Sequence, residues 1–204
     1  MTVKHVFHKR GEPIRYVYFP NGGVCSVTAT MKNGAAVEVA TVGDEGMLGV
    51  GAFLGDGVMA TGETLCQVAD TSAERMTVEA FRRELHRREA FHDLVGRYSQ
   101  GALALMLQST ACIALHGLKE RCCRWLLMTQ DRVRSDQFAL SHEFMAILLG
   151  ATRPTVSVVA GELQKAGLIR YTHARITIVD RKKLEAASCE CYETIRAEFE
   201  RLKL

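Results

Sequence analysis

The chain has 204 residues, is 48% hydrophobic and 24% charged, and carries a formal net charge of +3, which suits one large globular domain or two modest ones. No apolar run is long enough to span a membrane, and the first residues lack the apolar core of a signal peptide. These features exclude a membrane-spanning or exported class, so we expect a cytoplasmic protein with no membrane partner.

The first 89 residues predict a β-roll. Ten of the seventeen glycines lie between Gly22 and Gly62, which suits short strands joined by tight turns. Runs of β-branched and aromatic residues bounded by Gly, Pro, Asn or Asp mark strands at 14–19, 24–31, 35–42 and 64–68. Between the second and third of these, Asn33-Gly34 predicts a hairpin turn with positive φ at both positions.

A charged helix over residues 78–88 is followed by a long helix over residues 90–115. The long segment has no proline, and its apolar residues recur every 3.5 residues or so for about seven turns. This stripe consists of Phe91, Leu94, Val95, Tyr98, Ala102, Leu105, Met106, Ser109, Cys112 and Ile113. It is either a core helix packed on the roll or the seam of a coiled coil with a second copy. We favour the coiled coil, and hence a homodimer, because Gly101, Ala102 and Ala104 permit close approach.

Residues 142–161, HEFMAILLGATRPTVSVVAG, predict a helix-turn-helix. Ala146 is small where two helices would cross, and Gly150 suits a turn position at positive φ. Thr152 can cap the second helix, and Pro154 falls in its first turn, where a missing N–H costs nothing. The apolar anchors of the crossing are Met145, Leu149, Val156 and Val159. An ordinary helical hairpin has the same spacing, so the segments on either side decide between the two.

Those segments favour a winged helix. A helix over 118–130 precedes the motif, with Trp125 in its core, and Gly167 can end the second helix. Two strand-like runs at 168–171 and 175–179 follow, and then short helices at 182–187 and 191–202. Between Ser141 and Lys183, seven cations and three anions leave +4, more than the +3 of the whole chain. A polyanionic partner is therefore expected at this end.

This order of elements resembles the CRP/FNR superfamily of bacterial transcription regulators. The motifs that carry the resemblance are RCCRWLL at 121–127, the segment 151–169, and GEP at 11–13 followed by YFP-x-x-GV at 18–24. The resemblance implies an α+β fold with a cyclic-nucleotide-binding-like β-roll over 1–89, a dimerisation helix over 90–116, and a winged helix-turn-helix DNA-binding domain over 117–204. It further implies a homodimeric regulator, not an enzyme, that binds double-stranded DNA and RNA polymerase.

The family also has an effector pocket in the roll, and here this sequence departs from the nucleotide-binding members. A cyclic nucleotide needs a carboxylate for the ribose and an arginine for the phosphate, which the family supplies as Gly-Glu-Leu and Arg-Ser. This chain has Gly49-Val50-Gly51 and Ala60-Thr61 there, and its long helix is apolar near Met106. An uncompensated phosphate in an apolar pocket costs several kcal/mol. We therefore expect a small effector other than cyclic AMP, or none.

The cysteines suggest no cofactor. An odd number, seven, without framework spacing indicates reduced thiols. Cys122 and Cys123 would point about 100° apart on a helix and make a poor metal pair. The pair Cys189-x-Cys191 could in principle bind a metal with Cys66 or a histidine, but small buried filler is the commoner role of such sulfurs, so no metal is expected.

Two further metal centres that the family offers are not expected either. The iron–sulfur version requires an N-terminal cysteine cluster, which this sequence does not show. The haem version needs axial ligands, and His86 and His92, the candidates, fall on charged helices that predict exposure.

On the family pattern, the helix over 152–166 enters the major groove with its N-terminus first. Arg153 has the fork geometry for guanine O6 and N7, and short hydroxyl donors suit phosphate oxygens. Pro154 and Val158 stand where the family often has Glu and Arg, so only apolar contact remains there. The predicted contact set is Ser141, His142, Thr152, Arg153, Pro154, Thr155, Ser157 and Val158, with Thr172, His173 and Arg175 in the wing.

Two alternatives stand beside this interpretation. A metal-binding enzyme of the cupin type would need His and Glu clustered on facing strands, and the strand region offers His5 and His8 at odd spacing. A dimer that acts through protein contacts without binding DNA is the other, and Arg153 with a complete helix-turn-helix argues against it.

Overall fold

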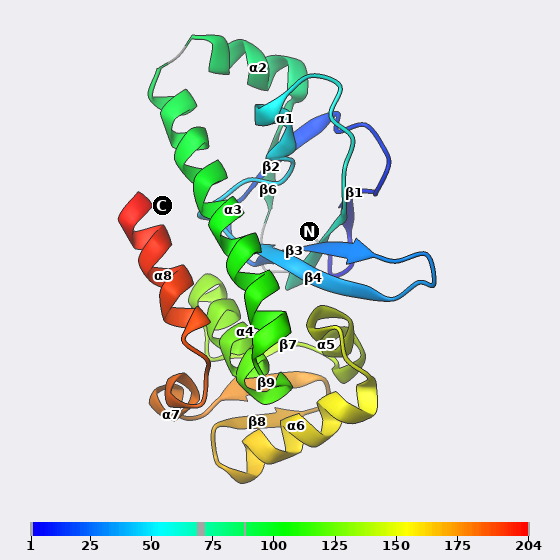
Figure 1. Ribbon diagram of the computed structural model, residues 1–204, viewed down its shortest axis with the longest axis vertical. Coiled ribbons are helices and arrows are strands. Elements are labelled where there is room, and N and C mark those ends of the chain that lie inside the picture. The colour runs from blue at the N-terminus through cyan, green and yellow to red at the C-terminus, as the bar shows by residue number, and fades with distance from the viewer. Residues whose placement is uncertain (1, 69–71, 88, 204) are drawn as a thin grey trace.

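Two antiparallel sheets form the N-terminal part of the computed structural model, which describes residues 2–68, 72–87 and 89–203 (Figure 1). The larger sheet has the order β1-β5-β3-β4, and the smaller pairs β2 with β6. The strands are β1 (Val6–His8), β2 (Tyr16–Pro20), β3 (Val24–Thr30), β4 (Ala36–Val42), β5 (Glu63–Val68) and β6 (Ala73–Thr77). The predicted β-roll is thus present, with β1, β6 and the short helix α1 (Gly51–Leu54) beyond the predicted elements.

The predicted hairpin joins β3 to β4, but its turn differs from the expectation. Gly34 has φ 85°, whereas Asn33 is not among the described residues with positive φ. Asn33 instead accepts a 3.1 Å hydrogen bond from the amide of Ala35 through Oδ1. That side-chain bond supports the turn from within, so one left-handed residue is enough to close it.

The helices that follow the roll begin at the predicted residues; α3 also ends as predicted, α2 ends two residues earlier and α4 three residues later. Helix α2 (Val78–His86) begins at Thr77, whose hydroxyl accepts from the Ala80 amide. Helix α3 spans Ala90–Leu115, and α4 (Leu118–Val133) begins after Gly117, whose amide donates to Glu120. The break predicted near residue 116 is therefore confirmed, because α4 has its own start signal there.

The apolar stripe of α3, however, mostly faces the chain's own core. Buried members of the stripe are Val95, Tyr98, Ala102, Leu105, Ser109 and Cys112. They pack against the roll on one side and against α8 (Cys191–Leu202) and α4 on the other. The expectation that this stripe forms the seam with a second copy is therefore wrong for these residues, since periodicity alone does not distinguish an intrachain core from an interface.

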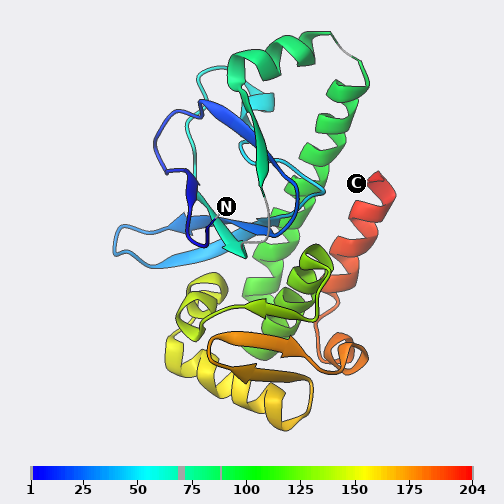
Figure 2. The same cartoon turned by 180° about the vertical axis from the view of Figure 1, so that it is seen from behind.

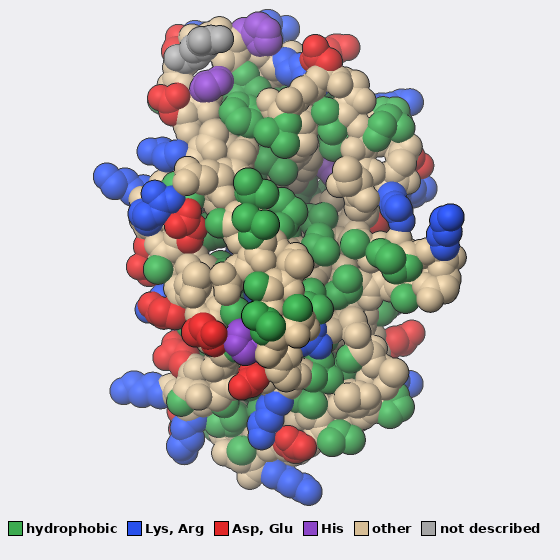
Figure 3. Space-filling view, in the orientation of Figure 1, with side chains coloured by type: hydrophobic (Ala, Val, Ile, Leu, Met, Phe, Trp, Pro, Cys, Tyr) green, Lys and Arg blue, Asp and Glu red, His purple; other side chains and the backbone are tan. Residues whose placement is uncertain are grey.

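A different face of α3 is open. Leu103 and Leu107 are 56% and 64% exposed, and Thr110 and Ala114 continue the same face at alternating spacings of three and four. Figure 3 shows hydrophobic side chains gathered along the middle of the face on which α3 runs in Figure 1. This open face has the spacing of a coiled-coil seam.

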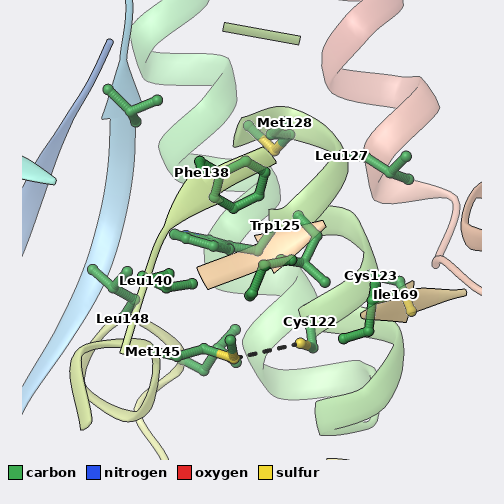
Figure 4. Close-up of a cluster of buried hydrophobic side chains, with 14 of the residues drawn as sticks. Cys122, Cys123, Trp125, Leu127, Met128, Phe138, Leu140, Met145, Leu148 and Ile169 are labelled. Atoms are coloured by element: carbon green, nitrogen blue, oxygen red, sulfur yellow. Dashed lines mark hydrogen bonds between the residues drawn. The ribbon is translucent and has the colours of Figure 1, made fainter. Parts of the chain in front are cut away.

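The C-terminal part is a winged helix. Its elements are α4, β7 (Gln137–Ala139), α5 (His142–Leu149), α6 (Arg153–Lys165), β8 (Ile169–Thr172), β9 (Arg175–Ile178), α7 (Arg181–Ala186) and α8. Its sheet has the order β7-β9-β8, and β7 is a strand that the sequence did not predict. In its core, Trp125 and Phe138 point into one cluster, and the Cys122 thiol lies 3.9 Å from Met145 Sδ (Figure 4).

Helix α8 runs back along α3 toward the roll, as both views show (Figures 1 and 2). The winged helix also touches the roll directly. Arg132 Nη2 lies 2.8 Å from Glu45 Oε1, and Arg134 Nη2 lies 2.7 Å from Asp44 Oδ2. Helix α5 packs against β4. The winged-helix part is therefore seated on both the roll and the long helix.

No single helix in the described part of the chain is long and apolar enough to cross a membrane. The pair α5–α6 reaches that length and hydropathy only when its two members are counted together, across a bend of 104°. Most of the apolar side chains of α5 and α6 are buried in the winged-helix core.

Candidate DNA interface and effector cavity

Helices α5 and α6 cross at 104°, within the range of helix-turn-helix motifs. Gly150 ends α5 in the left-handed region at φ 61°, as predicted. Ala146 is 6% exposed at the crossing, and the predicted anchors Met145, Leu149, Val156 and Val159 are all buried. Ser141 caps α5 and Thr152 caps α6, each accepting from a backbone amide three residues on. The small residue, the glycine and the two caps thus act locally as the sequence predicts.

The N-terminal turn of α6 is exposed and largely free. The Arg153 guanidinium makes no hydrogen bond or ion pair with any described residue, and Val158 is 61% exposed. Thr152 Oγ1 lies 2.7 Å from Thr155 Oγ1, so these hydroxyls support the cap while remaining at the surface. The first turn therefore presents an unengaged cation with apolar and hydroxyl groups beside it.

His142 is held inside the motif. Its ring stacks on Tyr171 of β8 at a centroid distance of 4.0 Å and an interplanar angle of 19°. Its Nδ1 lies 2.9 Å from Ser157 Oγ, and its Nε2 is buried without a partner among the described residues. Burial and then the charge of Arg153 lower the pKa of His142, so the ring is neutral. In this arrangement Nε2 is buried and Nδ1 is bonded to Ser157, so the geometry favours a positioning role for His142, and its expected phosphate contact stays a prediction.

Two residues that hold this region together are not predicted from the sequence. Tyr171 provides the stacking face for His142, and Gln164 Oε1 accepts a 2.7 Å hydrogen bond from the Tyr171 amide. Both contacts join α6 and the wing to the first helix. No local spacing signals them, because each depends on how β8 returns past α6.

The predicted wing is the β8–β9 hairpin. His173 and Ala174 have φ 50° and 58°, which makes the tight turn of a two-residue hairpin. Thr172 and Arg175 pair across the ladder and are exposed together with His173. Arg175 donates to Gln137 Oε1 of β7 at 3.3 Å, so its side chain reaches from the middle strand of the three-stranded sheet toward β7.

Some cations of the winged-helix part are engaged in ion pairs within the chain, and others are not. Arg181 is engaged with Asp131 at 2.7 Å, Glu185 at 2.9 Å and the Tyr192 hydroxyl at 2.6 Å. Lys183 pairs with Asp180 at 3.0 Å. Among the described residues, the cations of this segment with no ion pair are Arg153, Lys165, Arg170 and Arg175 on α6 or the wing, and Lys182 on α7. The sequence count thus included charges that serve the fold, and of those left over Arg153 lies in the first turn of α6.

The predicted effector residues line one cavity of about 380 Å³ in the roll. Its wall includes the whole predicted set, Gly49, Val50, Gly51, Ala60, Thr61 and Met106. Helix α3 contributes Leu105 beside Met106, and Phe199 reaches the wall from α8. The cavity therefore touches both the long helix and the helix that ends the winged domain.

The described lining of this cavity has two ionisable side chains, and both are neutral near pH 7. Burial lowers the pKa of His8, whose Nε2 lies 2.8 Å from the Tyr16 carbonyl oxygen. Burial raises the pKa of Tyr98, whose hydroxyl donates to the Met47 carbonyl at 3.1 Å. Because no cation faces the space, a phosphate group would find no charged partner in this lining.

The residues considered as haem or metal ligands in the roll do not come together in one site. His86 and His92 flank a separate cavity of about 310 Å³ between α1 and α2. Among the described residues of the roll, no three His, Cys, Asp or Glu side chains converge as metal ligands. The cupin alternative therefore has no constellation of ligands to support it in the described roll.

Comparisons with known proteins agree with this geometry. Residues 120–187 match the Crp-like helix-turn-helix domain family. The structure resembles a CRP-family transcriptional regulator from Thermus thermophilus with a TM-score of 0.74, at 22% identity, over 92% of this chain and 95% of that one. It resembles FixK2 from Bradyrhizobium japonicum with a TM-score of 0.76, at 19% identity, over 92% of this chain and 94% of that one.

A third solved structure is the c-di-GMP-responsive global regulator CLP from Xanthomonas campestris. It matches with a TM-score of 0.72 at 14% identity, over 88% of this chain and 92% of that one. A comparison with curated proteins finds no match. The chain thus has the fold of the CRP/FNR-family regulators, and its residues 120–187 form a Crp-like helix-turn-helix domain.

Proposed function

We propose that this protein is a sequence-specific DNA-binding transcription regulator that acts as a homodimer in the cytoplasm. The observation that carries the proposal is the unengaged Arg153 at the exposed N-terminus of α6, within a Crp-like helix-turn-helix whose helices cross at 104°. A free guanidinium at the leading end of the second helix is the arrangement with which such motifs read base edges.

In this proposal α6 enters the major groove and Arg153 bonds guanine O6 and N7. Pro154 and Val158 offer apolar contact, for example to a thymine methyl. Phosphate contacts come from the exposed hydroxyl groups and from the wing. The residues proposed for these contacts are Ser141, Thr152, Thr155, Ser157, Thr172, His173 and Arg175.

The homodimer would form through the open face of α3 that carries Leu103 and Leu107. Burying leucines of this size against a second copy is favourable by about 1.5–3 kcal/mol each. A two-fold dimer would place its two α6 helices in successive major grooves, about 34 Å apart. RNA polymerase is the protein partner that such a regulator would meet when bound near a promoter.

The effector proposed for the roll is small and uncharged, or absent. Support comes from the 380 Å³ cavity, in whose described lining His8 and Tyr98 are the ionisable groups and both are neutral. Phe199 gives such a ligand direct contact with α8. An apolar occupant would therefore act on the seating of the winged domain without any charged contact.

Site selection from a random duplex pool tests the function directly, followed by titration of the selected site. Arg153→Ala should weaken binding to that site by about 1–3 kcal/mol and relax preference at one guanine per half-site. Arg83→Ala, which removes an exposed arginine from α2, is the matched control and should leave both unchanged. Equal loss on selected and random duplex would make Arg153 a phosphate contact, and failure to select any sequence would contradict the proposal.

A further inference from the structure

Four potential metal ligands from distant parts of the chain meet where α3 ends. Cys112 and His116 come from the end of α3, and Cys189 and Cys191 come from the start of α8. Their ligand atoms all lie within 4.8 Å of one another. The Cys112 and Cys189 sulfurs are 3.5 Å apart, and Cys191 Sγ is 3.6 Å from His116 Nδ1.

Local geometry aims these side chains at one point. Cys112 lies in the last turn of α3, and His116 is the cap residue that directly follows that helix, so both lie at the same helix end. Cys191 is the first residue of α8, and Cys189 lies just before it. The three cysteines are at most 6% exposed, and His116 is partly buried. The space between them is therefore shielded from solvent by the two helix ends.

We propose that Cys112, His116, Cys189 and Cys191 form a tetrahedral site for Zn²⁺. Zinc binds thiolates at about 2.3 Å and imidazole nitrogen at about 2.0–2.1 Å in structural sites of the Cys₃His type. In a tetrahedron, sulfurs at that distance lie about 3.8 Å from one another. The observed sulfur–sulfur separation of 3.5 Å between Cys112 and Cys189 needs to change by only a few tenths of an ångström, and all four ligand atoms already lie within 4.8 Å of one another.

The chemistry of the donors selects the kind of metal. Three sulfurs and one nitrogen suit a thiophilic cation such as zinc, whereas calcium and magnesium need oxygen ligands. The four donors complete a tetrahedron and leave no position for water or substrate, which is typical of a structural centre. We therefore assign the site a structural role, in which the metal stabilises the fold.

Two neighbouring side chains are placed to orient these ligands. Glu190 Oε2 lies 3.0 Å from His116 Nε2, so the carboxylate can hold the ring with Nδ1 toward the sulfurs. Gln108 Nε2 donates to Cys191 Sγ at 3.0 Å. Ligating histidines are commonly held by a carboxylate in this way, and hydrogen bonds to sulfur stabilise the thiolate form. Cys66, a partner considered from the sequence, is instead opposite Cys25 in the roll.

A metal here would join the end of α3 to the start of α8. Helix α8 is packed along α3 and reaches the effector cavity through Phe199. The bound ion would therefore fix the root of α8, a helix that touches both the winged domain's core and the cavity. Its removal should loosen α8 before it disturbs the roll.

The test uses the full chain, purified under reducing conditions without added chelator. Elemental analysis should find about one zinc per chain, and cobalt loaded in its place should give the visible absorption of a tetrahedral thiolate complex. Cys191→Ser should lose the bound zinc and the cobalt spectrum. Cys66→Ala, which alters a buried cysteine outside the site, is the matched control and should keep both.

A second variant keeps the test decisive if Cys191→Ser fails to fold. His116 is partly exposed, so His116→Ala should fold and yet bind zinc much more weakly. A chelator should lower the melting temperature of the unaltered protein and leave that of His116→Ala unchanged. Absence of zinc and of the cobalt spectrum in the unaltered protein would overturn the proposal. Zinc retained equally by Cys191→Ser and His116→Ala, or a Cys112–Cys189 disulfide in freshly isolated metal-free protein, would do the same.

Discussion

Trp125 Nε1 of α4 donates a 2.8 Å hydrogen bond to Glu38 Oε1 of β4, and both side chains are buried. The other carboxylate oxygen of Glu38 lies 2.6 Å from Ser26 Oγ. This one acidic side chain therefore joins strands β3 and β4 of the roll to the core helix α4 of the winged domain. Its protonation state bears on how firmly the two parts are held together.

The stability of the protein should depend on pH through Glu38. Burial raises the pKa of Glu38 from its ordinary 4.5 to about 7, against the opposing hydrogen bonds and arginines. The folded state thus keeps a proton that the unfolded state loses above pH 4.5, so this group's contribution falls as pH rises from 4.5 to 7 and is constant above. The loss is on the order of 3 kcal/mol.

Glu38→Gln isolates this effect, because the amide keeps an acceptor for Trp125 and cannot ionise. Urea unfolding at several pH values should show the variant more stable than the unaltered protein at pH 8 and similar to it at pH 5. A difference between the two proteins that does not change with pH would refute the assignment.

The two leucines at 105 and 107 should respond in opposite ways to a charge. Leu107 is 64% exposed, so Leu107→Glu should leave the fold intact and convert a dimer into monomers. Leu105 is 3% exposed within the chain's own core, so Leu105→Glu should unfold the protein at a cost of several kcal/mol. Light scattering and circular dichroism separate the two outcomes. Met31→Glu, at an exposed hairpin position, is the control and should change neither.

Cyclic AMP should not bind at physiological concentration. The described lining of the effector cavity holds no cation for the phosphate, and its two ionisable groups are neutral. A buried phosphate without a charged partner costs several kcal/mol. Calorimetry with cyclic AMP and cyclic GMP measures this directly, and a micromolar affinity for either would show that other residues supply a phosphate site.

Gly46 is required for the wall beside Tyr98. A Cβ at Gly46 would lie 2.6 Å from Tyr98 Cζ and 2.7 Å from its hydroxyl oxygen, which donates to Met47. Gly46→Ala should therefore destabilise the fold by about 1–3 kcal/mol, since the buried ring has little room to shift. Gly55→Ala meets nothing within 4 Å and serves as the control. Thermal unfolding of both variants gives the comparison, and equal melting temperatures would contradict the close approach.

The elements that the sequence predicted well are those whose signals are local. The 90–115 helix and the helix-turn-helix follow from periodicity, from the caps Ser141 and Thr152, and from Gly150. Strands β1 and β7 have three residues each, and their existence depends on partners far along the chain. A short strand of that kind leaves no periodic signal, so sequence reasoning passed over it.

Long-range contacts account for the remaining differences. The period of the apolar stripe on α3 predicts a contact with a second copy, but the period is the same when the covering surface belongs to the same chain. The Cys-x-Cys pair was visible, but its ligand partner Cys112 lies 77 residues before Cys189 and comes near it only because α8 returns along α3. Tyr171 likewise stacks on His142 only because β8 returns past α6.

The stack of His142 on Tyr171 ties the first helix of the motif to the wing, and Gln164 ties the wing to α6. These contacts hold α5, α6 and the wing in one fixed arrangement. Under the proposed function, the bases contacted by α6 and the DNA backbone contacted by the wing should then keep a constant offset from one binding site to the next. Aligned binding sites should show one fixed spacing between the guanine proposed for Arg153 and the segment contacted by the wing, and inserting one base pair between the two should abolish the wing contact.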